Sequence, residues 1–329
     1  MSARRTYWHL EGLKRAPTDY EITSSRLLYH PTKGFEVDVP LAEWYRRHVK
    51  NSPFVLADAE RFSDPRETTY ASYTRLQKDQ EQQAQDFLDA MEAPDYDRAL
   101  PAGWITLLSR TLAPLRYPLH AMQMMAAYVG QSAPGGKIVI AALFQAADEM
   151  RRVQRIAYRM AQIQQTRPAF GRDSREIWER DPQWQPMRKL VERMLVTYDW
   201  AEALVALNVV LKPLFDELFM VQFGGVAAQS GDPLLGRVLL SLNADCLWHR
   251  DWTRTLLKLA VDERPENQGV LRGWIRRWHS EAIPAVAPFG PVFEAGGPSV
   301  GSRFAGVMAR LHQLCREYWA SAGLSSSTE

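Results

Sequence analysis

The sequence is poor in cysteine, with Cys246 and Cys315 as the only two among its 329 residues. Two cysteines can form neither a disulfide framework nor a cysteine-based zinc site. The glycine-rich phosphate loop G-x-G-x-x-G is also missing, although it is the usual fingerprint of a dinucleotide-binding fold. These absences argue against a disulfide scaffold, a zinc module and a dinucleotide-binding enzyme.

Concentrated charge is missing as well. The formal net charge is +2, and no stretch has the dense basic character of a nucleic-acid arm, so a nucleic-acid partner is not expected. Lysine is rare, and arginine carries most of the positive charge. Arginine suits ion pairs at interfaces better than lysine does. The base composition of the genome would explain the same bias equally well.

The sequence contains no uncharged apolar run long enough to span a membrane. The most apolar stretch, 203–225, carries Lys212, Pro213, Asp216 and Glu217, which indicates a buried helix rather than a membrane span. The first twenty residues contain no apolar segment of the kind found in secretory signals. We therefore expect a soluble cytoplasmic protein that has no membrane partner.

The chain divides into three regions. Residues 1–70, rich in proline, tyrosine and tryptophan, are expected to form an irregular arm that packs on a partner subunit. Residues 71–265 show long helical patterns and predict the core. Residues 266–329 predict C-terminal helices followed by a disordered tail. Because no run of strands is evident, the sequence predicts an all-α helical bundle with extensions at both ends.

Helical periodicity locates the individual elements. Residues 100–131 are helical, but Pro114 and Pro118 predict a kink or a break. Residues 174–189 are predicted to form a loop. Other helices are predicted over 70–91, 138–166, 188–226, 233–262, 269–282 and 302–319.

Ligand-type residues lie on the apolar faces of three of these helices. Glu149 shares a stripe with alanine and valine, and Glu202 and His249 have similar surroundings. A buried carboxylate needs a metal, a cation or a hydrogen-bond donor. The simpler interpretation is an ion pair between Glu149 and Arg152, with His249 as a hydrogen-bonded core residue.

The same positions have the spacing of a carboxylate-bridged di-iron bundle. That design needs two Glu-x-x-His pairs and one further Glu from each of two other helices. Here the pairs are Glu149–Arg152, which lacks the histidine, and Cys246–His249, which lacks the glutamate. Residues 117–125, where another ligand would stand, contain no acid. These degenerate pairs argue against a working metal centre, and we expect a packed, hydrogen-bonded polar cluster with Arg152 near Glu149 or Glu202.

Several segments together resemble one protein family. In order, they are 6–10 (TYWHL), 17–22 (PTDYEI), 43–54 (EWYRRHVKNSPF), 62–81, 112–134, 147–159 (ADEMRRVQRIAYR), 177–192 and 199–213. Their order and spacing are similar to the β subunit of the hydroxylase component of bacterial multicomponent di-iron monooxygenases, in the toluene (aromatic) and alkene group. The resemblance runs to about residue 280.

The resemblance implies a ferritin-like (ribonucleotide-reductase-like) bundle that is a non-catalytic subunit of an (αβγ)2 hydroxylase. In that family the α subunit carries the di-iron centre and the substrate cavity, so neither catalytic residues nor a cofactor are expected on this chain. An NADH reductase, a Rieske ferredoxin and an effector protein complete such systems, which hydroxylate aromatic hydrocarbons or epoxidise alkenes. Candidate subunit contacts are the arm aromatics and an arginine stripe: Trp8, Tyr20, Trp44, Tyr45, Arg151, Arg155 and Arg159.

Two alternatives remain at this point. An independent di-iron oxidase could use an unorthodox site made of Glu149, Glu202 and His249. A helical adaptor unrelated to oxygenases would also fit the periodicity. The arginine stripe could equally be a solvated helix face. The sequence does not identify the substrate, because the cavity is expected on the α subunit.

Overall fold

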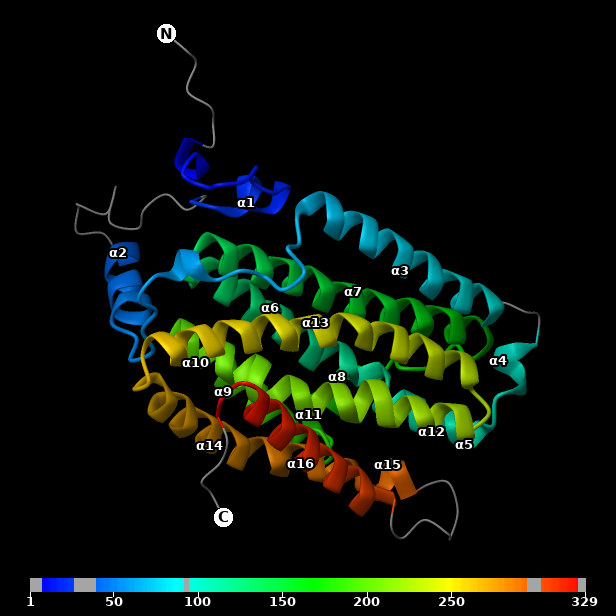
Figure 1. The fold of residues 1–329 in the computed structure, drawn as a ribbon. Helices are drawn as coiled ribbons and strands as arrows, with labels where there is room; N and C mark the ends of the chain where they lie inside the picture. Colours follow the sequence, from blue (N-terminus) through cyan, green and yellow to red (C-terminus); the bar gives the residue numbers. More distant parts are fainter. Residues whose placement is uncertain (1–7, 27–39, 92–94, 295–302, 325–329) are drawn as a thin grey trace.

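The computed structural model describes residues 8–26, 40–91, 95–294 and 303–324, and these contain helices and no strands. Figure 1 shows long helices that run side by side, with α3 along one edge and α14 and α16 along the opposite edge. The long core helices are α3 (Tyr70–Met91), α6 (Arg116–Ser132), α7 (Gly136–Thr166) and α13 (Pro233–Glu263).

Shorter helices connect and cover this core. They are η1 (Trp8–Leu10), α1 (Asp19–Ser24), α2 (Pro40–Tyr45), η2 (Arg46–Lys50), η3 (Ala59–Arg61), α4 (Tyr96–Ala99), α5 (Ala102–Thr111), η4 (Ala113–Leu115), α8 (Ser174–Arg180) and α9 (Gln185–Leu195). At the C-terminal side follow α14 (Asn267–Val286), η7 (Ala287–Phe289), α15 (Gly290–Glu294) and α16 (Arg303–Ser321).

The most deeply buried element is a helical rod over residues 200–229 whose hydrogen-bond pattern alternates between α and π. Its segments are α10 (Trp200–Leu204), η5 (Val205–Leu211), α11 (Lys212–Asp216), η6 (Glu217–Gln222) and α12 (Phe223–Gln229), of which η5 and η6 are π-helical. A π turn leaves backbone carbonyls with unused acceptor capacity. The indole of Trp319, on α16, donates to one of them, the carbonyl oxygen of Val209, at 3.0 Å.

Polar contacts and one stacked ring pair hold the first half of α3, in which Tyr73 stacks on Phe144 of α7 with the ring centroids 4.3 Å apart. Ala84 is the first buried residue of this helix, although its C-terminal half also buries Leu88. Earlier along the helix, Tyr73 and Gln77 hydrogen-bond to Asp148 of α7. At the edge of the bundle in Figure 1, α3 is therefore held by hydrogen bonds to α7 as well as by packing.

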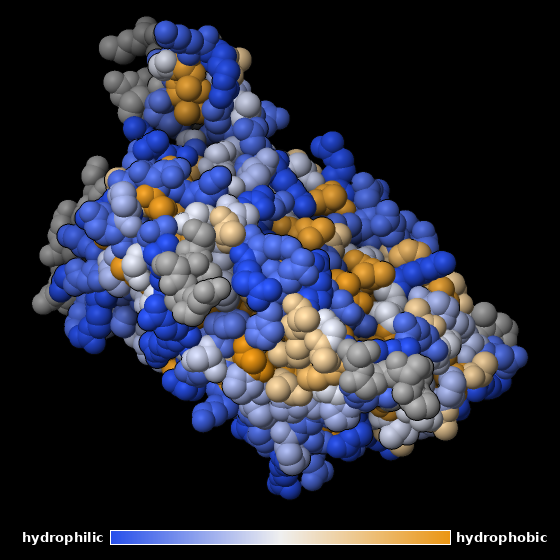
Figure 2. Space-filling view, turned by 60° about the horizontal axis from the view of Figure 1, so that its bottom comes forward, coloured by the Kyte–Doolittle hydropathy of each residue, from blue (hydrophilic) through white to orange (hydrophobic). Residues whose placement is uncertain are grey.

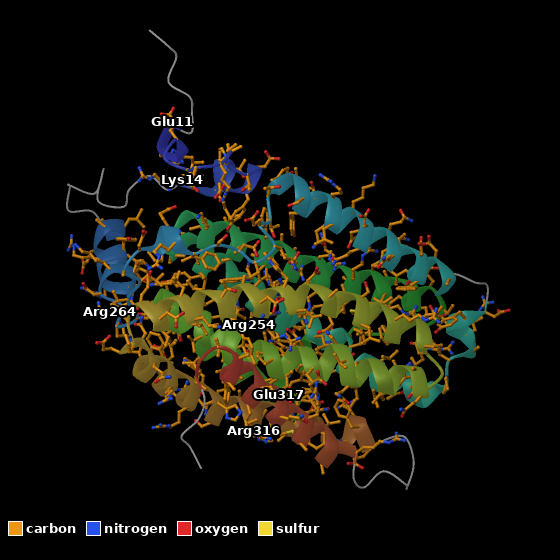
Figure 3. All side chains as sticks on the ribbon, in the orientation of Figure 1. Glu11, Lys14, Arg254, Arg264, Arg316 and Glu317 are labelled. Carbon is orange, nitrogen blue, oxygen red and sulfur yellow. The ribbon has the colours of Figure 1, made fainter. Side chains whose placement is uncertain are left out.

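The N- and C-terminal elements surround the bundle. Figure 3 places Glu11 and Lys14 on a segment that projects beyond the bundle, whereas Arg316 and Glu317 lie on α16 along its side. The Tyr20 hydroxyl of α1 accepts a hydrogen bond from the backbone N–H of Asp64 at 2.9 Å. On the face shown in Figure 2, hydrophilic colouring predominates and the hydrophobic groups are scattered among it.

Most of the predicted helices are present, with three differences. The loop predicted over 174–189 is wrong, because α8 and α9 occupy most of it. The helix predicted over 188–226 is interrupted between Leu195 and Trp200, where Asp199 caps a new helix. Pro114 lies in the break between α5 and α6, but Pro118 is tolerated in the first turn of α6, where its missing N–H costs little. No helix in the described ranges is both long and apolar enough to cross a membrane.

The Asp199 cap provides a test of how this rod begins. One Asp199 carboxylate oxygen accepts from the backbone N–H groups of Ala201 and Glu202, each at 3.0 Å. Replacing Asp199 with alanine should lower the free energy of unfolding by about 1–2 kcal/mol. Denaturant unfolding followed by circular dichroism measures this. Asp95→Ala is the matched control, because Asp95 precedes α4 without a side-chain cap. Equal losses in the two variants would contradict the assignment.

Candidate functional site

Four charged side chains form a closed buried ring in the centre of the bundle. Each is at most 1 % exposed: Glu149 and Arg152 from α7, and Lys212 and Asp216 from α11. Two positive and two negative groups make the ring neutral when all four are ionised. We refer to these four residues as the charge ring.

Within the charge ring, cations and carboxylates alternate. The Arg152 guanidinium donates to Glu149 Oε2 at 2.6 Å and to Asp216 Oδ1 at 2.7 Å. The Lys212 ammonium donates to Glu149 Oε1 at 2.5 Å and lies 3.1 Å from Asp216 Oδ2. All four carboxylate oxygens therefore face a positive nitrogen, which offsets much of the cost of moving the charges out of water.

The pKa shifts agree with an ionised ring. Burial works against ionisation of Asp216, but Lys212 and Arg152 outweigh it and lower the Asp216 pKa to about 2. Burial likewise lowers the pKa of Lys212, yet attraction to Asp216 and the other acidic groups nearby leaves that pKa above its ordinary value. Both charges therefore persist throughout the physiological pH range.

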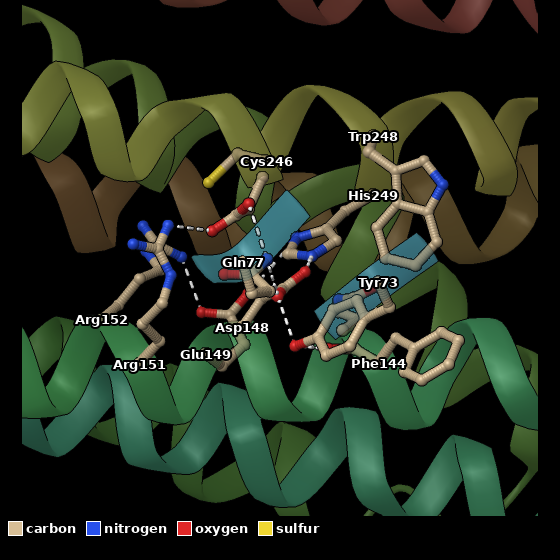
Figure 4. Close-up of polar contacts among 12 residues, drawn as sticks. Tyr73, Gln77, Phe144, Asp148, Glu149, Arg151, Arg152, Cys246, Trp248 and His249 are labelled. Carbon is tan, nitrogen blue, oxygen red and sulfur yellow. Dashed lines mark hydrogen bonds and ion pairs between the residues drawn. The ribbon is translucent and has the colours of Figure 1, made fainter. Parts of the chain in front are cut away.

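A second layer of hydrogen bonds surrounds His249 of α13 (Figure 4). Its Nε2 lies 2.9 Å from Asp148 Oδ2, and its Nδ1 lies 3.7 Å from Glu149 Oε1. Burial, followed by the charges of Lys212 and Arg152, lowers the pKa of His249 well below its usual value, so the imidazole is neutral. Tyr73 and Gln77 of α3 complete the layer by donating to Asp148 Oδ1, each at 2.8 Å.

Arginines connect this layer to α3. Arg151 donates to Asp245 Oδ2 at 2.5 Å and to Glu81 Oε1 at 3.1 Å. Arg155 also binds Glu81, so two arginines of α7 share one glutamate of α3. Hydrogen bonds and ion pairs therefore join α3, α7 and α13.

Cys246 lies beside the charge ring, and burial makes its thiol unreactive. Burial raises its pKa to about 12. Its sulfur lies 3.9 Å from the Lys212 ammonium and donates weakly to the carbonyl oxygen of Leu242 at 3.6 Å. A thiol with so little thiolate is neither a nucleophile nor a ready metal ligand.

The donor set does not fit a di-iron centre. Such a centre needs carboxylates that are free to bridge the metals and histidines whose nitrogens face them. Here both oxygens of Glu149 are hydrogen-bonded to cations, and two positive side chains would repel an incoming metal ion. Within the described ranges, no group of three His, Cys, Asp or Glu side chains has the arrangement of a metal site.

The structure brings together four of the five predicted ligand positions and excludes Glu202. Glu149, Arg152, Cys246 and His249 lie in or beside the charge ring, whereas the Glu202 carboxylate accepts from Trp278 Nε1 at 3.0 Å and from Arg277 at 2.9 Å. Burial raises the pKa of Glu202. The alternative site made of Glu149, Glu202 and His249 is therefore not assembled. Glu202 lies several turns before the ring along the rod, and Asp216 supplies the second carboxylate instead.

Sequence reasoning missed the other members of this network. Lys212 and Asp216 were read as evidence against a membrane span, but their spacing of four in an apolar run was the signal of a buried ion pair. Asp245 lies four residues before His249 and so on the same side of the helix, but it is not part of a Glu-x-x-His pair. The other missed partners are Tyr73, Gln77, Glu81 and Asp148.

The predicted subunit-contact residues have diverse surroundings. Tyr20 is buried and Tyr45 packs partly buried against the core, whereas Trp44 is 38 % exposed and contacts Tyr198 edge to face. The side chain of Trp8 lies outside the described residues.

The predicted arginine stripe lies within the chain, contrary to its expected role as a contact surface or solvated face. Arg159 is fully buried and makes two hydrogen bonds to Asp97 of α4, at 2.6 and 3.0 Å. Arg151 and Arg155 join α7 to α3 as described above. Their function in this structure is to fix α3 and α4 against α7.

Comparison with known proteins gives a consistent result. Residues 44–264 match the family model of methane/phenol/alkene hydroxylases. The chain is 34% identical over 292 residues to the hydroxylase component subunit beta of the toluene-4-monooxygenase system of Ectopseudomonas mendocina, covering 87% of this chain and 89% of that protein. It is also 30% identical to the hydroxylase component small subunit of propane 2-monooxygenase from Gordonia sp. (strain TY-5), over 60% of this chain and 54% of that protein.

Solved structures share the fold. A chain of toluene 4-monooxygenase, with toluene bound in its resting active site, superposes with a TM-score of 0.84 at 33% identity and covers 89% of this chain and 98% of that one. A chain of xenon-pressurised phenol hydroxylase from Pseudomonas sp. OX1 also gives a TM-score of 0.84, at 21% identity, and covers 95% of this chain and 92% of that one. The second likeness supports the fold alone.

Removing one cation should unbalance the charge ring. Lys212→Met leaves Glu149 and Asp216 with Arg152 as their only cationic partner inside the core. We expect the free energy of unfolding to fall by about 3–5 kcal/mol. Lys258→Met removes an exposed lysine of α13 and should change it by no more than about 0.5 kcal/mol. Chemical denaturation of both variants measures the difference, and a loss below about 1 kcal/mol for Lys212→Met would sink the idea that the ring is fully ionised.

Thiol labelling tests the burial of the two cysteines. Burial raises the pKa of both Cys246 and Cys315 to about 12. Iodoacetamide at pH 8 should therefore leave both unmodified in the folded chain and alkylate both after unfolding in guanidinium chloride, as read by intact mass. Rapid alkylation of the native chain at Cys246 would show that the ring is open to solvent.

Proposed function

The chain belongs to the methane/phenol/alkene hydroxylase family, and from this membership we propose that it is the non-catalytic β subunit of a multicomponent di-iron monooxygenase hydroxylase. The complex would have the composition (αβγ)2 and would insert one oxygen atom of O2 into an aromatic hydrocarbon or an alkene. The di-iron centre would lie on the α subunit. An NADH reductase, a Rieske ferredoxin and an effector protein would complete the system.

The charge ring is the observation that carries the non-catalytic part of this proposal. Arg152 and Lys212 neutralise the carboxylates of Glu149 and Asp216, which leaves no acid in the ring free to bind iron. In place of the metals, the two cations hold α7 to α11. A bundle of this kind keeps its shape without a cofactor and can support a neighbouring catalytic subunit.

The role in the mechanism is indirect. The charge ring is fully buried, and the groups around it are engaged with one another rather than with a cavity. The neutral imidazole of His249 is bound to Asp148 and cannot reach solvent. We assign this network to positioning helices, so the chemistry and the substrate preference of the complex would depend on the α subunit.

Metal analysis of the chain alone and in its complex tests the proposal. The chain purified alone should contain far less than one iron, whereas co-expression with an α-type chain that carries two intact Glu-x-x-His pairs should give a complex with about two irons per αβ unit. Oxygen-dependent turnover should appear only in the complex supplied with its reductase, ferredoxin and effector. About two irons on the lone chain, together with oxygen-dependent turnover, would overturn the assignment in favour of an independent oxidase.

A further inference from the structure

Two buried carboxyl groups of the second layer share one hydrogen-bond donor. The side-chain amide nitrogen of Gln77 lies 2.8 Å from Asp148 Oδ1 and 3.3 Å from Asp245 Oδ1, so α7 and α13 bring the two acids together beside α3. Each acid is 1 % exposed. Two neighbouring carboxyl groups away from water do not both ionise readily, because the charge of one raises the pKa of the other. One of the two is therefore expected to keep its proton at neutral pH.

The surrounding donors determine which acid keeps the proton. Arg151 donates to Asp245 Oδ2 at 2.5 Å, which stabilises the ionised form of Asp245. The hydrogen-bonding partners of Asp148 are uncharged, and Figure 4 shows them converging on its carboxyl group: Tyr73, Gln77 and His249. Asp245 therefore carries a charge, and Asp148 is the more favourable place for the proton.

The balance of buried charge also favours one extra proton. The charge ring and the second layer together contain four acids and three permanent cations: Asp148, Glu149, Asp216, Asp245, Arg151, Arg152 and Lys212. At their edge, the half-buried pair of Glu81 and Arg155 is balanced by itself. Since His249 is neutral, four ionised acids would leave one negative charge in the core without a counter-charge. A proton on Asp148 removes that charge.

The surroundings of the His249 ring fit a protonated Asp148. Its Nδ1 makes no hydrogen bond to any described residue and lies 3.7 Å from Glu149 Oε1. If Asp148 were ionised, Nε2 would hold the proton of the ring, and Nδ1 would turn a lone pair toward the negative Glu149. With Asp148 protonated, its hydroxyl donates to Nε2, and Nδ1 carries the hydrogen and points an N–H dipole at Glu149. The second arrangement is favourable at both ring nitrogens.

The pKa shifts agree with this placement of the proton. Burial, followed by the negative charge of Asp245, raises the pKa of Asp148 well above its usual value. The hydrogen bond from Tyr73 and the charge of Arg151 lower that pKa, but they do not outweigh the two larger effects. The charged or titratable groups that act on Asp148 or His249 come from α3, α7, α11, α13 and the segment before α3: Tyr73, Glu149, Arg151, Arg152, Lys212, Asp245, Arg250 and Arg66.

We propose that Asp148 is a buried neutral acid that donates its proton to His249, and that this proton makes the attachment of α3 sensitive to alkaline pH. Deprotonation would place a second negative charge beside Asp245 and turn the His249 lone pair toward Glu149. Because α3 makes two hydrogen bonds to Asp148, its first half is the part of the bundle that would loosen. The pKa of such an acid is higher in the folded chain than in the unfolded one, so stability declines as the pH rises from the usual pKa of aspartate to the raised value. The inference concerns this chain itself and does not depend on the function proposed above.

Asp148→Asn in the full-length chain tests this, because an asparagine amide has the hydrogen-bonding pattern of a protonated aspartate. Its oxygen accepts from α3 and its NH2 group donates to His249. Between about pH 5 and about pH 8, the melting temperature of the variant relative to the wild type should rise by at least about 4 °C, because only the wild type releases a proton on unfolding. Asp245→Asn is the matched control. It deprives Arg151 of its buried partner and should lower the melting temperature by at least about 5 °C at both pH values.

Two further measurements distinguish a stored proton from a merely structural role of Asp148. In infrared spectra at neutral pH, the wild type should show the carbonyl band of a protonated carboxyl group, and Asp148→Asn should lack it. At the same alkaline pH, backbone hydrogen exchange over residues 70–80 should be faster in the wild type than in Asp148→Asn, and equal exchange would refute the coupling to α3. A melting temperature that falls equally at all pH values in Asp148→Asn, with no acid band in the wild type, would show that Asp148 is ionised and would overturn the proposal. A band that persists in Asp148→Asn and vanishes in Asp245→Asn would place the proton on Asp245 and would overturn it as well.

Discussion

The charge ring is the constraint on which the rest of the structure depends. Two carboxylates and two cations with at most 1 % exposure persist only because each carboxylate oxygen faces a positive nitrogen. That requirement fixes α7 against α11 and fixes the register of the π-interrupted rod. It also explains the surrounding layer, because Asp148 and Asp245 need their own donors from α3 and from Arg151. The fold thus retains the inward polar groups of a metal-binding bundle and satisfies them with nitrogen atoms.

The charge ring is one of several buried polar contacts made by the charged residues of α7. The arginines of α7 form ion pairs with Asp216, Asp245, Glu81 and Asp97. Every charged residue of α7 is buried or half-buried, and the exposed positions of this helix carry no charge.

The sequence predicted the class of fold and the main helices because the apolar periodicity of long helices is strong. It also identified Glu149, Arg152, Cys246 and His249, since spacing within one helix is visible in one dimension. It assigned Glu202 to the wrong cluster and missed Asp216, because residues 203–220 are buried all round and their apolar pattern does not mark the face that points toward α7. The arginine stripe was misread for a related reason. Periodicity shows that Arg151, Arg155 and Arg159 share a face, but not whether that face points inward.

The hydrogen bond from Trp319 to the carbonyl of Val209 has a consequence for the order in which the protein is made. Trp319 belongs to α16, whereas Val209 belongs to the rod at the centre of the bundle. Because Val209 precedes Trp319 by more than a hundred residues, the ribosome releases the rod first, and this carbonyl is paired only once α16 has been made and has packed against it. This part of the core is therefore completed late, whatever the order in which the other helices assemble.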